Sequence, residues 1–240
     1  MGACDAKTEG LTMLASIVKR IIDFFTRILW TIYYAFYWIG RGFLLLPNLW
    51  QLFRLHAPRV TFFGGAKVAL TDRYALDARL LAKKCVENNI SIITGGGAGI
   101  MEAAALGAQD ARPRGVRCLG VGVLGFQESV APVYKTFIRV KHLIERKWLM
   151  IHFSQTCVVF PGGVGTYNEF AEVLTLIDME LMRHVPFVLY GKDYWQPILT
   201  WVKDVGIKQG FVDKQLINYV VLVDDVDTAF EWIKRACRKK

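Results

Sequence analysis

The ten residues from Phe160 to Glu169, with the sequence FPGGVGTYNE, are the part of this chain best suited to chemistry. Backbone N–H groups in a glycine turn can approach an anion closely, and a helix that follows adds its unpaired first-turn amides and the positive end of its dipole. Thr166 contributes a hydroxyl that could contact the same anion, and Glu169 contributes a carboxylate that could act as acid or base. The stretch therefore predicts a phosphate-binding turn with a catalytic group beside it.

Glu169 also has a purely structural interpretation. The spacing Thr166-x-x-Glu169 is that of a capping box, in which both side chains bond to the first backbone amides of a helix. A cap does not explain why three glycines occupy four positions before the threonine. The phosphate-binding interpretation is therefore favoured, and the cap is kept as the alternative.

The elements that would position these groups alternate regularly from Arg59 onward. Short β-branched or aromatic runs are separated by segments of helical length, which predicts an α/β fold with a doubly wound parallel sheet flanked by helices. The predicted strands are 59–63, 91–94, 116–123, 156–160, 185–190 and 220–223, and the predicted helices include 73–88, 98–110, 141–154, 166–182 and 226–237. In such a sheet, ligands bind at the carboxyl ends of the strands.

Three of the predicted strands are followed by glycine turns, at 64–65, 95–99 and 162–165. Equivalent positions place all three turns at one edge of the sheet, which favours a nucleotide or another phosphate ligand. The spacing differs from the G-x-G-x-x-G pattern of dinucleotide folds, so no NAD and no other cofactor is predicted. The residues predicted to bind this ligand are Gly95, Gly96, Gly97, Gly162, Gly163, Val164, Gly165 and Thr166.

Residues 11–53 differ from the rest of the chain, being rich in aromatic and aliphatic residues with interspersed lysine and arginine. The uncharged run 28–40 is shorter than the roughly 20 residues of a membrane span, and Arg41 interrupts its extension. We therefore divide the chain into a hydrophobic, basic helical extension (1–57) and a nucleotide-binding domain (58–240). Two interpretations of the extension stay open: contact with a membrane surface through residues 11–53, or packing on the domain or across an oligomer interface.

The net charge and the distribution of cysteine and histidine exclude several classes of partner and site. The net charge of +9 arises partly in the apolar extension, a pattern that favours anionic lipid headgroups over nucleic acid, so no nucleic-acid partner is expected. The five cysteines are scattered without a C-x-x-C pair and the four histidines are isolated, so no metal site and no disulfides are predicted. These features fit a cytoplasmic protein, with the cytoplasmic face of a membrane as the alternative location.

Three motifs make a family resemblance specific: Thr94-GGGAGIM-Glu102, Glu145-RKWL-Met150 and Pro161-GGVGTYN-Glu169. Together they resemble the LOG family, often mislabelled as lysine decarboxylases, over about residues 59–235. The resemblance implies a Rossmann-like fold, a homodimer, and hydrolysis of the N-glycosidic bond of a nucleoside 5′-monophosphate such as AMP, an N6-modified AMP or a cytokinin riboside monophosphate. The products would be the free base and ribose 5-phosphate. No sequence context marks a pyridoxal-phosphate lysine, so lysine decarboxylation is set aside.

The resemblance also implies roles for individual residues. Arg146 and Glu169 match the family's catalytic pair, while Lys147, Gly163 to Thr166, Thr175 and, by its distance from the Arg-Lys pair, Glu128 match ligand-binding positions. Asn168 departs from plant-type members, which commonly carry a second glutamate there. The alternative function is a nucleotide-binding sensor that does not hydrolyse its ligand and is coupled to a membrane or partner through the extension.

Overall fold

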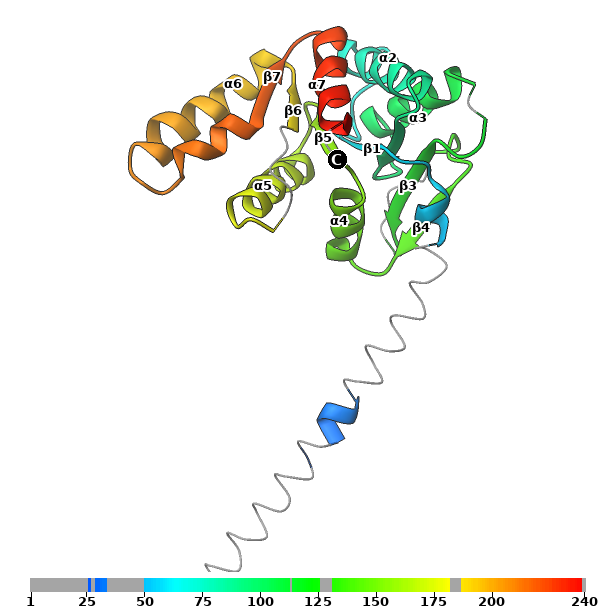
Figure 1. Ribbon diagram of the computed structural model, residues 1–240, viewed down its shortest axis with the longest axis horizontal. Helices are drawn as coiled ribbons and strands as arrows, with labels where there is room; N and C mark the ends of the chain where they lie inside the picture. Colours follow the sequence, from blue (N-terminus) through cyan, green and yellow to red (C-terminus); the bar gives the residue numbers. More distant parts are fainter. Residues whose placement is uncertain are drawn as a thin grey trace, which may run out of the picture. The chain divides into compact units, whose positions relative to one another are not determined.

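The computed structural model describes residues 26, 29–33, 50–112, 114–125, 131–181 and 187–238 (Figure 1). The chain divides into two compact units, Met1–Pro47 and Asn48–Lys240. In the first unit, residues 26 and 29–33 are helical and exposed, and the rings of Trp30 and Tyr33 meet edge to face at 5.9 Å. Most of residues 11–53 lies outside the described part. Within the described residues, no helix has the length and apolar character needed to cross a membrane.

The second unit is built on a seven-stranded parallel sheet in the order β4-β3-β2-β1-β5-β6-β7. The strands are β1 (Arg59–Phe63), β2 (Ser91–Thr94), β3 (Cys118–Val123), β4 (Phe137–Val140), β5 (Thr156–Val159), β6 (Phe187–Tyr190) and β7 (Val220–Val223). The chain first winds outward from β1 to β4 and then returns to place β5 on the other side of β1. This reversal between β1 and β5 is the point where doubly wound sheets bind ligands. The predicted α/β, Rossmann-like fold is confirmed.

Helices cover both faces of the sheet (Figure 1). The α-helices are α2 (Arg73–Glu87), α3 (Ile100–Asp110), α4 (Leu143–His152), α5 (Val164–Asp178), α6 (Lys192–Trp201) and α7 (Val226–Arg238). A π-helix, η1 (Val202–Ile207), continues α6, and a 3-10 helix, η2 (Lys214–Tyr219), precedes β7.

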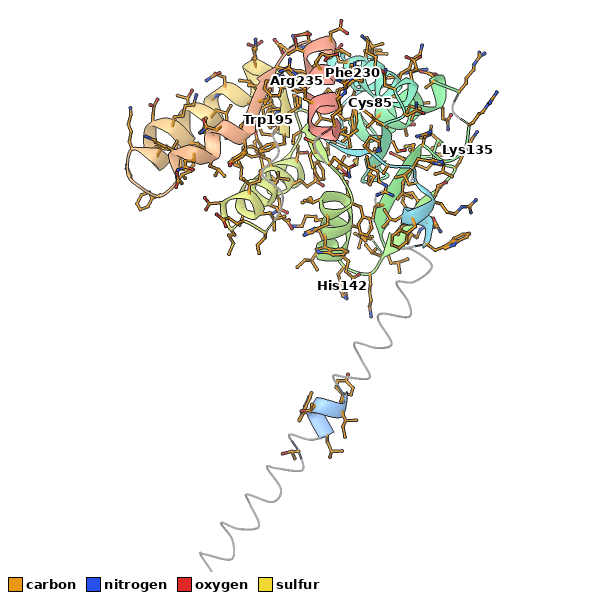
Figure 2. The ribbon with its side chains drawn as sticks, in the orientation of Figure 1. Cys85, Lys135, His142, Trp195, Phe230 and Arg235 are labelled. Carbon is orange, nitrogen blue, oxygen red and sulfur yellow. The ribbon has the colours of Figure 1, made fainter. Side chains whose placement is uncertain are left out.

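Each face of the sheet has its own apolar core because successive side chains of a strand point to opposite sides. Phe62 and Ile92 pack in one core with α2, α3 and α7, which includes Cys85 and Phe230, both labelled in Figure 2. Phe63 and Ile93, one residue further along the same strands, pack in the second core with α4, α5 and α6. The continuous apolar strands of the sequence are therefore explained by burial on both sides.

Residues 50–54 form a helical turn that belongs to the second unit. Leu52 and Leu55 are fully buried in the core beneath α4 and α5, and the Arg59 guanidinium donates to the Leu55 carbonyl at 2.7 Å. The chain thus divides after Pro47, whereas the sequence analysis drew the domain boundary after residue 57.

Four elements, β4, α6, η1 and η2, were not predicted from the sequence, and the helices α3, α4 and α5 each begin two residues from the predicted start. Strand β4 and helix α6 were missed; α6 carries Pro197 in its interior, a residue that normally argues against a helix. Helix α5 begins at Val164 rather than at Thr166. This shift of two residues changes the interpretation of Glu169.

Candidate active site

The three glycine turns meet at the carboxyl edge of the sheet. The Gly65 amide donates to the Pro161 carbonyl at 3.0 Å, and the Ile100 amide donates to the Gly65 carbonyl at 3.1 Å. A Cβ added to Gly65 would lie 3.1 Å from the Cα of Gly162, so the two turns pack backbone to backbone. The ends of β1, β2 and β5 therefore form one continuous surface of main chain.

A cavity of about 190 Å³ opens beside this surface, over the ends of β2, β3 and β4. It is lined by Gly95, Gly96, Gly97, Gly122, Val123, Leu124, Gly125, Phe137, Arg139 and Arg146. Gly96 has a φ of +80°, and a Cβ there would overlap the Phe137 ring. Glycine is thus required at this turn by both its backbone conformation and the aromatic ring beneath it.

Arg146 is the buried cation of this cavity. Helix α4 begins at Leu143, and Glu145 fixes its first turn by accepting from the backbone amides of Lys141 and His142 at 3.1 and 3.2 Å. The next residue, Arg146, is only 7% exposed. The helix start therefore directs a guanidinium inward, toward the glycine turn after β2.

The Arg146 guanidinium lies against Gly95, where any side chain would displace it. A Cβ on Gly95 would overlap Nη2 and lie 2.9 Å from Cζ of Arg146. Nη2 contacts the sulfur of Met101 at 3.9 Å, and Nε has no hydrogen-bond partner among the described residues. A buried cation with unused donors is costly unless an anion compensates it. The site is therefore suited to an anionic ligand at the glycine turn.

Lys147 points the other way, toward helix α5. It forms an ion pair with Glu172, and its ammonium group donates to Oδ1 of Asn168 at 3.0 Å. In the sequence of α5, Glu169 lies between the two residues that Lys147 contacts, Asn168 and Glu172. The pair of contacts holds α4 beside α5, and it brings the helix that carries Arg146 next to the helix that carries Glu169.

Glu169 is a residue of the second turn of α5 and does not cap the helix. Gly163 is the N-cap residue, the first turn contains no acidic residue, and Thr166 is the third residue of the helix. The capping-box alternative is therefore wrong. Burial, with a smaller contribution from the negative charge of Glu169, raises the pKa of the Cys157 thiol to about 12. Glu169 is partly buried.

One side of the turn of residues 161–166 packs against the protein, and its other side is exposed to solvent. The Thr166 side chain is buried against Gly162, and the Tyr194 hydroxyl donates to the Gly162 carbonyl. A Cβ added to Gly163 or to Gly165 would meet no atom within 4 Å, and Val164 is 84% exposed. The exposed backbone of this turn is therefore accessible to a ligand.

Of the predicted ligand-binding residues, Gly95, Gly96 and Gly97 line the cavity. The described residues Lys147, 162–166 and Thr175 are not part of its lining, and neither is Glu169. The Thr175 hydroxyl is exposed and donates to the Ala171 carbonyl of its own helix at 2.8 Å. Glu128 lies outside the described residues. The described part of the chain also contains no group of three or more residues able to hold a metal ion.

Residues of β3 and β4 also belong to the site, although none of them was among the predicted site residues. Phe137 forms the aromatic wall of the cavity, and Arg139, which also lines it, stacks over that ring at 5.0 Å. Tyr134 supports the turn after β2 by bonding the Thr94 hydroxyl at 2.5 Å and the Met101 carbonyl at 2.8 Å, and burial raises its pKa well above the usual value. The short run Phe137-Ile-Arg-Val140, which is apolar and β-branched except for Arg139, is the signal that could have found this edge.

The fold defines a Rossmann-like α/β protein with glycine turns and a buried arginine at the carboxyl edge of its sheet. Residues 101–233, more than half of the chain, match a family described as "Possible lysine decarboxylase". The chain belongs to this family, the LOG family.

Named relatives agree with this assignment, and a solved structure shares the fold. The chain is 25% identical to the cytokinin riboside 5′-monophosphate phosphoribohydrolase of Rhodococcoides fascians, over 73% of this chain and 88% of that protein. It is 28% identical to LOG5 of Arabidopsis thaliana, a protein with the same description, over 64% of this chain and 67% of that one. The molybdenum cofactor binding protein of Rippkaea orientalis shares the fold at 19% identity, with a TM-score of 0.57 over 75% of this chain and 97% of that chain.

Proposed function

We propose that this protein hydrolyses the N-glycosidic bond of nucleoside 5′-monophosphates, releasing the free base and ribose 5-phosphate. The proposed substrates are AMP and N6-modified AMP of the cytokinin riboside monophosphate type, because the named relatives are described as phosphoribohydrolases of such compounds. The protein would act without a cofactor, and a homodimer remains the expected assembly.

The observation that carries this proposal is the position of Arg146. Its guanidinium is buried against Gly95 in a cavity at the carboxyl edge of the sheet, with Nε unpaired among the described residues. Arginine offers several N–H donors in a planar arrangement that suits phosphate and sugar oxygens. A substrate that carries a phosphate and a ribose supplies such oxygens.

Glu169 supplies the second group that the reaction needs. Breaking a ribosyl C–N bond develops positive charge on the sugar, and a nearby carboxylate stabilises that charge and orients the attacking water. The leaving base takes the bonding electrons and gains a proton, while the water oxygen forms the new bond at the ribose carbon and gives up one of its protons to the Glu169 carboxylate or to solvent. Glu169 lies in the second turn of α5, and the contacts of Lys147 with Asn168 and Glu172 hold this helix beside the one that carries Arg146.

The test is to incubate the purified full-length protein with AMP and with a prenylated AMP, and to measure free base and ribose 5-phosphate. The expected result is release of both products in equal amounts. Nucleotide binding without product, for every nucleoside monophosphate offered, would overturn the hydrolase proposal and favour the alternative, a sensor that binds nucleotide without cleaving it.

A further inference from the structure

An exposed aromatic cluster lies on the surface of the second unit, away from the glycine turns. Trp50 and Phe53 of the helical turn 50–54 are 61% and 71% exposed. The Phe53 ring meets that of Phe153 at 6.3 Å, and Phe153 meets Trp148 of α4 at 5.9 Å. Ile144, one turn before Trp148 on α4, is 70% exposed. We call these apolar side chains of the turn 50–54 and of α4, together with Phe153, the aromatic face.

Basic residues surround the aromatic face. The Arg54 guanidinium stacks over the Trp50 ring at 4.7 Å, and a hollow of about 410 Å³ separates the turn 50–54 from β4. The hollow is lined by Trp50, Gln51, Arg54, Val116, Lys135, Thr136 and Phe137. Exposed Lys135 precedes β4 and exposed His142 follows it, and Figure 2 labels both at the surface of the domain.

The sequence around these residues contains very little negative charge. Between Asp110 and Glu145 there are six basic residues, Arg112, Arg114, Arg117, Lys135, Arg139 and Lys141, and one acidic residue, Glu128. No acidic residue occurs between Asp23 and Asp72, the stretch that contains the turn 50–54. Glu145 itself is engaged with the backbone at the start of α4. The edge of the domain at β3 and β4 is therefore positively charged.

We propose that the aromatic face docks on an anionic lipid bilayer. Tryptophan and phenylalanine side chains insert at the boundary between headgroups and acyl chains, while arginine and lysine attract anionic headgroups. The hollow between Arg54 and Lys135 is placed to receive a headgroup phosphate. The occupant of this surface is thus identified by charge complementarity together with exposed aromatic area.

Two further observations favour a bilayer over a second copy of this chain. A twofold interface would bring the same basic residues of both copies toward each other, and such like-charge contacts are unfavourable. The face also begins at Trp50, within the apolar and basic sequence 11–53 that precedes the sheet. A lipid surface satisfies both the charge and the apolar character of this segment.

The test uses the full-length protein labelled with an environment-sensitive fluorophore at single introduced cysteines. The label is placed at Phe53→Cys or at Trp148→Cys, and at Phe211→Cys as a matched control that is 79% exposed in the segment between η1 and η2. Cys4, Cys118 and Cys237 are replaced by serine, while Cys85 and Cys157 are buried and burial raises the pKa of their thiols, which protects them from labelling. Vesicles consist of phosphatidylcholine with or without phosphatidylserine.

The expected result is a blue shift at positions 53 and 148 with vesicles that contain phosphatidylserine, and no shift at position 211. In unlabelled protein, Trp50→Ser with Phe53→Ser should weaken vesicle binding by about tenfold, whereas Trp201→Ser with Phe211→Ser should not. An unchanged signal at positions 53 and 148, or an equal shift at 211, would overturn the proposal. A shift that follows protein concentration without vesicles would also overturn it and would identify a second copy as the occupant.

Discussion

The glycine turn after β2 and the glycine turn after β5 use the same residue type for opposite purposes. At Gly95 the space that a side chain would occupy is filled by the Arg146 guanidinium. At Gly163 and Gly165 the corresponding space contains no atom within 4 Å. The first turn is therefore shaped by a residue of the protein, and the second leaves its backbone exposed.

This difference indicates that the two turns have different roles: the turn after β2 positions Arg146, and the turn after β5 is accessible to a ligand. Arg146 is pre-positioned by packing, so it is held in place before any ligand arrives. The amides of the turn after β5 and the first turn of α5 remain open to an anion from solvent. Substitutions that fill these two spaces should therefore have different effects. A side chain at Gly95 should displace Arg146, and a side chain at Gly163 should block access of the ligand to the backbone.

The largest effect on catalysis is expected from substitution of Glu169, which follows the exposed glycine turn after β5. Glu169→Gln should lower kcat by roughly 1,000-fold because it removes the charge that stabilises the ribosyl cation and orients water. Nucleotide affinity, measured by calorimetry, should change little. Glu180→Gln, an exposed change just beyond the end of the same helix, is the matched control. Unchanged turnover in Glu169→Gln would refute the assigned role.

Gly95→Ala should lower kcat/KM by about 100-fold by displacing the Arg146 guanidinium, since misplacement of a positioning group by about 1 Å has effects of that size. The displaced atoms are the end of a flexible side chain, so thermal unfolding should change little. The control is a double-mutant cycle: in an Arg146→Ala background, Gly95→Ala should add almost nothing. Additive losses would show that Gly95 acts independently of Arg146.

Gly163→Ala should weaken nucleotide binding by about tenfold because the added methyl group enters the space in front of the open turn. Its φ of −86° and ψ of −161° are accessible to alanine, so the free energy of unfolding should change by less than ~1 kcal/mol. Binding is measured by calorimetry and stability by urea unfolding. Normal affinity would mean that the ligand does not use this turn.

Gly165→Ala should give the smallest effect, a rise in the free energy of unfolding of ~0.5–1 kcal/mol. Residue 165 is inside α5 and faces open space, and alanine is the better helix former. The matched comparison is Gly162→Ala, which should destabilise the protein because its Cβ would collide with Thr166. Urea unfolding distinguishes the two. If Gly165→Ala destabilised the protein as much as Gly162→Ala does, the space around residue 165 would not be open.

Much of the sheet could be predicted from local sequence. The strands at 59–63, 91–94 and 220–223 have the predicted bounds because each is a short β-branched or aromatic run between turn residues. Strand β4 was missed because Arg139 interrupts its apolar run, as is common at the edge of a sheet. Helix α6 was missed because Pro197 and the preceding Gly191 argue locally against a helix.

The sequence by itself determined the alternation of strands and helices, the glycine turns after three strands and the motifs that carry the family resemblance. Those features depend on neighbours within a few residues. Only the tertiary structure decided that Arg146 fills the space at Gly95, that Lys147 is paired with Glu172, and that Phe137 forms the wall of the cavity. These contacts join residues on different elements, and their geometry follows from packing across the sheet, which local patterns do not specify.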